Sequence, residues 1–450
     1  MLSKDIVLVV ADTLTAFHLP FYGYERDTAP FLSDLAEENF LFKHAYAPAP
    51  WTVPVHASMF TGEMPDVHGT HSESLFFDSS SVAEELSQEG YRTIGVSSNY
   101  LVSETLGFDR GFDFFASDDG IFLELNNLDS LKRVFEREQK GEYDSKLEKY
   151  GDFLSISLSN FDFSSIYQGA RFLFGKELSD SFTLYGDSGA SIANRVVERE
   201  LSSTEEDFFL FVNYMETHQP FRLPDDFNFS YLEEQDLEEK YLDKVWNSDL
   251  QGEEVDQELI DISKDFYDTT IRYLDTKIEE LYRLVNEESD DFVFIVVGDH
   301  GEMLGDEDVW GHQNGIWEEL IRVPAIVAGS GVDAGEENSY FSLRRVYDII
   351  KGENPRDLTS SKIFADYRGV EGFSEKFGDG KSPEDEKARK YYFNKSKAVV
   401  ENGELYVENT ELLDKRYGVG NKGKGKVLEP VEVPNSIKIR FGSDLDSLEF

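Results

Sequence analysis

Cysteine is absent from the 450-residue sequence. Disulfide bonds, zinc–thiolate sites and cysteine nucleophiles are therefore excluded. Basic residues are scarce as well: 43 lysines and arginines stand against 90 aspartates and glutamates, which gives a formal net charge of -47. Such a surface repels polyanions, so we expect no binding to nucleic acid. Because the acidic residues are spread along the whole chain, the composition resembles that of halophilic proteins, whose self-repulsion is screened by molar salt.

Long hydrophobic runs are also missing. A membrane-spanning helix needs about 20 consecutive apolar residues, whereas the first apolar run, Ile6–Ala11, already ends at Asp12. We find no signal-peptide pattern ahead of this run. We therefore expect a soluble, cytoplasmic protein without a membrane span, and the sequence gives no indication of its oligomeric state.

Short apolar runs of strand length recur along the chain and alternate with helical patterns. They are Ile6–Ala11, Phe40–Tyr46, Tyr91–Ser97, Phe208–Tyr214, Phe292–Val297 and Val323–Ala328. The most apolar of these runs are typical of strands buried on both faces of a sheet. The alternation of strands and helices predicts an α/β fold with one doubly wound, mostly parallel sheet flanked by helices.

Two regions depart from this alternation. Residues 120–185 hold charged and aromatic pieces without a clear strand, and we interpret them as an insertion that could cover a site. Towards the C-terminus, turn residues separate three strand-like runs, Lys397–Val400, Glu404–Val407 and Ser436–Phe441. The sequence therefore predicts a main α/β domain over residues 1–355 and a small C-terminal α+β subdomain with antiparallel strands over residues 360–450.

Polar side chains stand at or shortly after the ends of four of the predicted strands. They are Asp12, Asn99, His218, and Asp299 with His300. Ligands of open α/β sheets gather beyond the carboxyl ends of the strands, so we expect these side chains to converge. Two carboxylates and an imidazole suit one divalent cation, either Mn²⁺, Mg²⁺ or Ca²⁺, with Zn²⁺ less favoured.

Thr52 comes just before a predicted helix that has Pro54 in its first turn and ends at Gly62. One interpretation is an ordinary N-cap, for which threonine is well suited. The other is a nucleophile, because a hydroxyl at a helix amino terminus faces free amide groups that bind anions. A cation between Asp12 and Asp299 would take the Thr52 oxygen as a further ligand, lower its pKa and neutralise a phosphoryl or sulfuryl oxygen.

The chain has only eight histidines, and three of them come soon after predicted strands: His218, His300 and His312. A single histidine in such a place is often a structural hydrogen-bonding residue. Three of them after buried strands favour a functional site. His218 and His312 are our candidates to protonate a leaving-group oxygen.

Several of these motifs together resemble those of the sulfatase family in the alkaline phosphatase superfamily. The matching segments are Val10–Thr13, Tyr22–Pro30, Ala47–Gly62, Tyr214–Phe221, Gly298–Gly305, Trp310–His312 and Glu318–Pro324. The resemblance implies the same α/β fold with a smaller C-terminal subdomain. It places the metal ligands at Asp12, Asp299 and His300, and the nucleophile at Thr52. It also places a substrate or leaving-group histidine at His218.

The sequence departs from the family pattern around the expected nucleophile. True sulfatases carry a cysteine or serine that is converted to formylglycine, with an arginine further along the motif. Here the motif has Thr52 and His56, so that aldehyde cannot form. The paired aspartates of the family's metal site are reduced to Asp12 and Thr13. We expect His56 and Asn99 to contact the substrate in this altered site.

A threonine nucleophile instead resembles the phosphoglycerol transferases and phosphodiesterases of the same superfamily. A threonine ester has to be resolved by attack at sulfur or phosphorus, and attack at phosphorus is chemically better supported. We therefore expect a single-metal hydrolase or phosphotransferase that cleaves a sulfate or phosphate (di)ester of a small molecule or glycan. The alternative is a catalytically degenerate family member that binds an anionic glycan or headgroup without turnover.

Overall fold

A computed structural model of the protein describes residues 5–72, 74–117, 187–219, 221–224, 227, 231, 257–305, 310–312, 315–368, 396–401, 403–408 and 438–441. The expected insertion at residues 120–185 lies outside these ranges. Among the helices within them, none is long and apolar enough to cross a bilayer.

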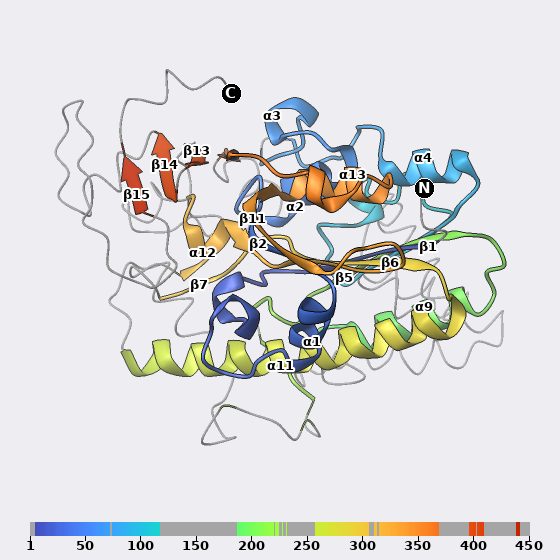
Figure 1. The fold of residues 1–450 in the computed structure, drawn as a ribbon, viewed down its shortest axis with the longest axis horizontal. Coiled ribbons are helices and arrows are strands. Elements are labelled where there is room, and N and C mark those ends of the chain that lie inside the picture. Colours follow the sequence, from blue (N-terminus) through green and yellow to red (C-terminus); the bar gives the residue numbers. More distant parts are fainter. Residues whose placement is uncertain are drawn as a thin grey trace, which may run out of the picture.

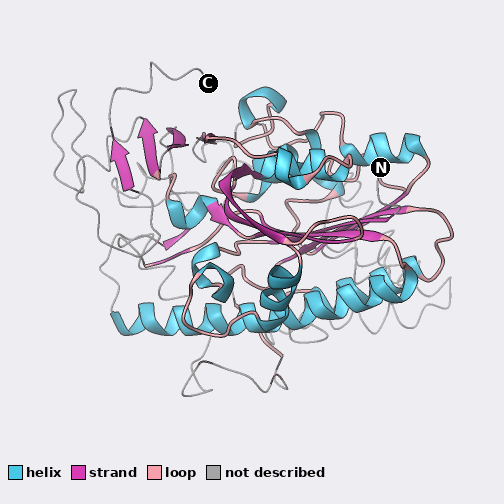
Figure 2. Ribbon diagram, viewed as in Figure 1, coloured by secondary structure: helices cyan, strands magenta, loops and turns pink. Residues whose placement is uncertain are grey.

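A mixed sheet forms the centre of the molecule (Figure 1, Figure 2), with the strand order β11-β2-β10-β6-β1-β5-β3-β4. The strands are β1 (Asp5–Ala11), β2 (Phe40–Tyr46), β3 (Arg92–Ser97), β4 (Phe114–Ser117), β5 (Phe208–Tyr214), β6 (Phe292–Gly298), β10 (Ala325–Gly329) and β11 (Gly335–Ser342), and β9 (Arg322–Val323) pairs with β2. Neighbouring strands from β6 to β4 are parallel, whereas β10 runs antiparallel to both β6 and β2. The predicted mostly parallel sheet is confirmed.

Helices cover both faces of this sheet (Figure 1). On one face lie α2 (Thr52–Thr61), α4 (Val82–Glu89) and α13 (Val346–Ile350), and on the other lie α1 (Pro30–Glu38), α9 (Ala190–Leu201) and α11 (Gln257–Glu288). Because side chains alternate along a strand, Leu8 of β1 packs into one hydrophobic cluster and Val9 into the other. Burial on both faces explains why the central strands are apolar throughout.

Shorter elements connect the main ones. They are α3 (Pro65–His68), α12 (Glu318–Ile321), the antiparallel pair β7 (Met303–Leu304) and β8 (Trp310–Gly311), and the 3-10 turns η1 (Ala16–His18), η2 (Pro20–Tyr22), η3 (Glu104–Leu106), η5 (Leu343–Arg345) and η6 (Pro355–Asp357). The turns η1 and η2 form the connection that leaves β1 and leads to α1. These short turns therefore determine the path of the chain where it leaves the carboxyl end of β1.

A second, small sheet follows towards the C-terminus, as expected. Its strands are β12 (Lys362–Tyr367), β13 (Ser396–Glu401), β14 (Glu404–Glu408) and β15 (Lys438–Phe441). The first three are antiparallel, while β15 pairs in parallel with β14. Ile363 and Val400 belong to the same hydrophobic cluster as the helix α2. This sheet therefore shares its core with one face of the main sheet, and the domain boundary near residues 355–360 stays a prediction.

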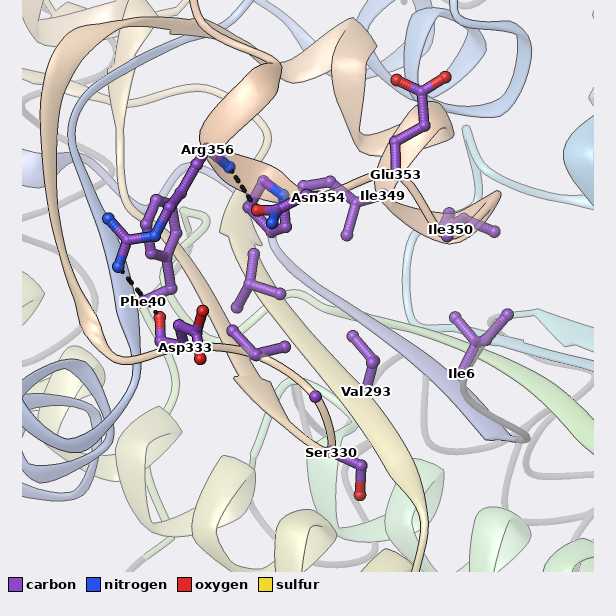
Figure 3. Close-up of a pocket in the computed structure, with 15 residues that line it drawn as sticks. Ile6, Phe40, Val293, Ser330, Asp333, Ile349, Ile350, Glu353, Asn354 and Arg356 are labelled. Atoms are coloured by element: carbon purple, nitrogen blue, oxygen red, sulfur yellow. Dashed lines mark hydrogen bonds between the residues drawn. The ribbon is translucent and has the colours of Figure 1, made fainter. Parts of the chain in front are cut away.

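A cavity of about 250 Å³ lies at the amino ends of β1 and β6 (Figure 3). Ile6, Val293 and Ile350 contribute apolar side chains to it. At its side, the guanidinium carbon of Arg356 lies 4.8 Å from the ring centre of Phe40. Asp12 and Asp299 follow the opposite, carboxyl ends of the same two strands, so this cavity is separate from the residues singled out by the sequence.

Candidate metal and catalytic site

Two adjacent strands bring Asp12, Asp299 and His300 together. Asp12 follows β1, and Asp299 and His300 follow β6, whose register places Gly298 opposite Ala11. All three side chains are fully buried. One potential ligand atom from each lies within 4.8 Å of the others. The structure therefore assembles a group of three potential ligands from residues almost 290 positions apart, as the parallel topology requires.

Each of the two carboxylates has one oxygen held by the protein and one that is not. Asp299 Oδ1 accepts from the backbone N–H of Thr13 at 3.0 Å and of His300 at 2.7 Å. Asp12 Oδ2 accepts from Asn99 Nδ2 at 2.6 Å. Asp12 Oδ1 and Asp299 Oδ2 are buried without a hydrogen-bond partner among the described residues. Burial and the nearby charge of Asp12 raise the pKa of Asp299.

His300 adds a third atom that could bind a cation. Its Nδ1 lies 2.9 Å from the carbonyl oxygen of Gly301, an acceptor that assigns the ring proton to Nδ1. Nε2 therefore carries a lone pair, and it lies 3.5 Å from Asp299 Oδ2 and 3.8 Å from Asp12 Oδ1. Burial lowers the pKa of His300, which favours the neutral ring. Two unpartnered carboxylate oxygens and one imidazole nitrogen form a donor set that fits a divalent cation.

The glycine after His300 is required by packing. A Cβ atom on Gly301 would lie 1.9 Å from the carbonyl oxygen of Glu319, well inside the contact limit. The carbonyl oxygen of the same glycine lies 2.9 Å from His300 Nδ1. Position 301 therefore excludes a side chain and also supplies the acceptor for the imidazole.

Thr52 is the first residue of α2, and the N-cap position belongs to Trp51. The interpretation of Thr52 as an ordinary N-cap is therefore wrong. Its hydroxyl oxygen lies 3.2 Å from His300 Nε2 and 3.5 Å from Asp12 Oδ2. The residue is almost completely buried. The hydroxyl is thus turned towards the candidate ligands and lies within the group that they form.

Two further histidines border this group. The ring centre of His312 lies 4.7 Å from that of His300 and 5.0 Å from that of His218. His312 Nδ1 lies 3.2 Å from both carboxylate oxygens of Glu302, a buried acid that the sequence analysis did not single out. Burial alone would lower the pKa of His312, but the charge and hydrogen bond of Glu302 outweigh it and raise this pKa. The signal for Glu302 was its place two residues after His300.

The family model for sulfatases matches residues 4–346 of the chain. The chain belongs to the sulfatase family. It is 24% identical to the choline-sulfatase of Rhizobium meliloti over 74% of this chain and 64% of that protein's length. It is 23% identical to an arylsulfatase of Clostridium perfringens over 73% of this chain and 69% of that protein.

The fold of this sulfatase-family chain is similar to two solved phosphonate monoester hydrolases. For the hydrolase of Agrobacterium radiobacter the TM-score is 0.59 at 14% identity, over 90% of this chain and 87% of the other. For that of Silicibacter pomeroyi the TM-score is 0.58 at 15% identity, with the same coverage. At such identities the likeness concerns the fold alone, and it agrees with the predicted α/β architecture.

The predicted substrate contacts of His56 and Asn99 stay predictions, and both side chains have partners within this sulfatase-family fold. His56 Nδ1 donates to the Thr52 carbonyl oxygen at 3.0 Å, and its Nε2 lies 3.3 Å from Asn213 Nδ2. Burial lowers the pKa of His56 to about 4, so the ring is neutral. Asn99 donates its amide to Asp12. This geometry favours a supporting role for both side chains behind Thr52 and Asp12.

Proposed function

We propose that this chain is a metal-dependent hydrolase or transferase that cleaves a sulfate or phosphate (di)ester of a small molecule or glycan. Thr52 is the proposed attacking group. The observation that carries the proposal is its hydroxyl, 3.2 Å from His300 Nε2. The same nitrogen lies 3.5 and 3.8 Å from two carboxylate oxygens that have no hydrogen-bond partner among the described residues. Membership of the sulfatase family and the relatives named choline-sulfatase and arylsulfatase support ester cleavage.

The proposed cofactor is one divalent cation held by Asp12, Asp299 and His300, with the Thr52 oxygen as a further ligand. The carboxylate-rich donor set favours Mn²⁺, Mg²⁺ or Ca²⁺ over Zn²⁺. When bound, such an ion lowers the pKa of a coordinated hydroxyl and offsets negative charge on the oxygens of the ester. The two unpartnered oxygens support this assignment, because buried carboxylates without a donor or a cation are costly.

The remaining roles fall to side chains around this group. Thr52 begins α2, so the first helical turn presents the amide groups of Thr52 and Val53, though none from Pro54, and these suit an anionic ester group. The Glu302 carboxylate is hydrogen-bonded to Nδ1 of His312. Nε2 of the same ring is therefore the atom that would give a proton to the leaving-group oxygen. His218 borders the same histidine ring and is the second candidate for this proton transfer.

Phosphate or phosphodiester transfer is the preferred reaction, because a threonine ester must be resolved by direct attack at its central atom. Sulfate ester cleavage is the second possibility within the same mechanism. Binding without turnover is the alternative function, and one observation favours it. His56 stands in place of the arginine of the sulfatase motif, and both of its ring nitrogens have partners within the protein.

Assays with p-nitrophenyl sulfate, p-nitrophenyl phosphate and a p-nitrophenyl phosphodiester in molar salt test this proposal, with Mn²⁺, Mg²⁺ or Ca²⁺ added. We expect turnover of at least one ester and a loss of roughly 10³-fold or more in Thr52→Ala, as for other enzymes that lose a nucleophile. Thr52→Ser retains a hydroxyl and is the matched control. Activity that survives in Thr52→Ala would remove Thr52 from this role. Tight metal binding without turnover by the unmodified protein would favour the binding alternative.

A further inference from the structure

Thr13, the residue after Asp12, has an unusual backbone conformation. Its φ is 59°, the only positive value outside glycine among the residues that the structure describes. Left-handed backbone is disfavoured for L-residues and most of all for β-branched side chains. Such strain persists only where the surrounding structure holds it in place. The contacts of Thr13 therefore indicate which interactions depend on this strained conformation.

The N–H of this left-handed residue is directed at Asp299. This N–H donates to Asp299 Oδ1 at 3.0 Å, and the N–H of His300 donates to the same oxygen. With Oδ1 occupied by two amides, Oδ2 is the oxygen left near His300 Nε2, at 3.5 Å. The backbone of Thr13 thus helps to determine which Asp299 oxygen is available to a cation.

Tyr267 of α11 holds the peptide groups that follow the strained residue. Its hydroxyl donates to the Thr13 carbonyl oxygen at 2.6 Å and accepts from the Thr15 N–H at 3.0 Å. The side chain is fully buried. Its ring packs edge-on against His18, with the ring centres 5.0 Å apart, and lies 5.7 Å from the ring centre of Phe221. The position of the hydroxyl is therefore fixed by a long helix and by its packing.

Thr217 holds the other side of the same turn. Thr13 Oγ1 donates to the Thr217 carbonyl oxygen at 2.6 Å, and Thr217 Oγ1 donates to the Asp12 carbonyl oxygen at 2.5 Å. These two bonds join the loop after β1 to the loop after β5. They hold the Thr13 side chain and the carbonyl before it, whereas Tyr267 holds the Thr13 carbonyl itself.

We propose that Tyr267 is a positioning residue for the cation site and acts through Thr13. Its hydroxyl keeps Thr13 in the left-handed conformation. In this conformation the Thr13 N–H is bonded to Asp299 Oδ1, and Asp299 Oδ2 remains available to the cation. The inference rests on the proposed function, because it requires a cation bound between Asp12 and Asp299. Among the described residues, the Tyr267 hydroxyl is hydrogen-bonded to the backbone of Thr13 and Thr15 and not to a candidate ligand, so its effect on the ion passes through the backbone of the turn.

Calorimetric titration of Mn²⁺ into EDTA-treated protein measures this role without an activity assay. Tyr267→Phe removes the hydroxyl and retains the ring that packs against His18. We expect this variant to bind Mn²⁺ about 10- to 100-fold more weakly, the usual cost of losing a residue that orients metal ligands. Saturating Mn²⁺ is expected to restore most of the turnover, because the reacting groups themselves are unchanged.

Tyr273→Phe is the matched control. Tyr273 lies on the same helix, is almost as buried, and donates its hydroxyl to Asp187 Oδ2 at 2.7 Å, outside the candidate ligand group. We expect a similar loss of thermal stability in the two variants but an unchanged Mn²⁺ affinity in Tyr273→Phe. Tight Mn²⁺ binding by Tyr267→Phe, or equal weakening in both variants, would overturn the assignment. If the unmodified, folded protein bound none of the three cations, the proposed function itself would fail.

A glycine at position 13 tests whether the effect passes through the strained turn. Glycine adopts positive φ without steric cost, so Thr13→Gly removes the strain that Tyr267 is proposed to hold. We expect Tyr267→Phe to cost less Mn²⁺ affinity in the Thr13→Gly background than in the unmodified protein, as a coupled pair does in a double-mutant cycle. An equal cost in both backgrounds would show that Tyr267 acts by another route.

Discussion

Asp268 on α11 and Asp299 beyond β6 are equally inaccessible to solvent, but their oxygens are used in different ways. Asp268 Oδ1 lies 2.6 Å from His18 Nδ1, and its Oδ2 accepts from the Tyr24 hydroxyl at 2.6 Å and from Arg26 Nη1 at 2.8 Å. Asp299 Oδ2 has no partner among the described residues. Burial alone therefore does not mark a functional carboxylate. The informative feature is a buried oxygen for which the protein supplies no donor.

Asp275 shows how completely the protein can satisfy a buried acid. Its two oxygens accept from the backbone N–H groups of Phe31 and Leu32, both at 2.9 Å. These amides belong to the first turn of α1, which begins at Pro30 and has no capping side chain of its own. A carboxylate on α11 thus caps a helix that packs against it. Its role is structural, in contrast to that proposed for Asp299.

Replacing Asp299 should have the largest effect of the changes that probe this contrast. We expect Asp299→Asn to weaken Mn²⁺ binding by roughly 10³-fold, because a charge contact at about 4 Å contributes about 4 kcal/mol at an intermediate dielectric. Without metal, the variant should be as stable as the unmodified protein or more so, because repulsion from Asp12 is relieved. Thermal melting with Mn²⁺ and with EDTA measures both effects, since a bound ion raises the melting temperature.

The contrast between Asp299 and Asp268 would not hold if, in EDTA, Asp299→Asn lowered the melting temperature as much as Asp268→Asn. That result would mean that Asp299 is a structural acid like Asp268. It would also remove the reason for placing a cation beside it. Melting of both variants in the same buffer decides between these two descriptions.

Replacing Asp268 should have the next largest effect, now on stability. We expect Asp268→Asn to lower the free energy of unfolding by about 2–3 kcal/mol, because it removes the buried charge and replaces one acceptor oxygen by an amide group that cannot accept. Asp265→Asn is the control: Asp265 pairs with the same Arg26 at 2.6 Å but is partly exposed, so its loss should cost at most about 1 kcal/mol. Urea unfolding in EDTA gives both values. Equal losses in the two variants would show that the burial of Asp268 adds nothing to the contribution of its ion pair to stability.

The sequence was sufficient to predict the central strands and to single out the candidate ligands that directly follow them. Asp12, Asp299 and His300 stand at the ends of apolar runs, and parallel topology places such ends together. Two strands at the edges of the sheet were missed. β11 is a polar edge strand with several exposed residues, and β4 has four residues at the opposite edge. Patterning cannot identify such strands, because neither has two buried faces.

The supporting residues of the site were beyond sequence reasoning for a different reason. Tyr267 lies in an amphipathic helix, where one more aromatic residue looks like core packing. Its hydrogen bond to Thr13 joins residues 254 positions apart, so only the folded chain shows it. The position of Thr52 was misjudged by one residue at the start of α2, a typical error for helix ends. Local patterns thus singled out candidate ligands but not the contacts that orient their side chains.

Glu216 shares features with both kinds of carboxylate. Its Oε1 accepts from the Ala190 N–H at 2.8 Å, and its buried Oε2 has no partner among the described residues. Burial and, next, the charge of Asp187 raise the pKa of Glu216 to about 8. At neutral pH a proton therefore neutralises this acid, whereas the acids near His300 are proposed to share a metal ion.

This pKa sets the sign of a pH dependence that Glu216→Gln should remove. The folded-state value lies above the ordinary value of 4.5, so the unfolded chain releases the proton first, and stability falls as pH rises from 4.5 to about 8. We expect Glu216→Gln to flatten this fall and to change little at pH 4 or below. Urea unfolding across that range measures the slope, with the exposed Glu198→Gln on α9 as the control for total charge. An unchanged slope would mean that something other than a proton neutralises the charge of Glu216. A buried oxygen without a hydrogen-bond partner would then no longer distinguish the proposed metal site from the other buried acids.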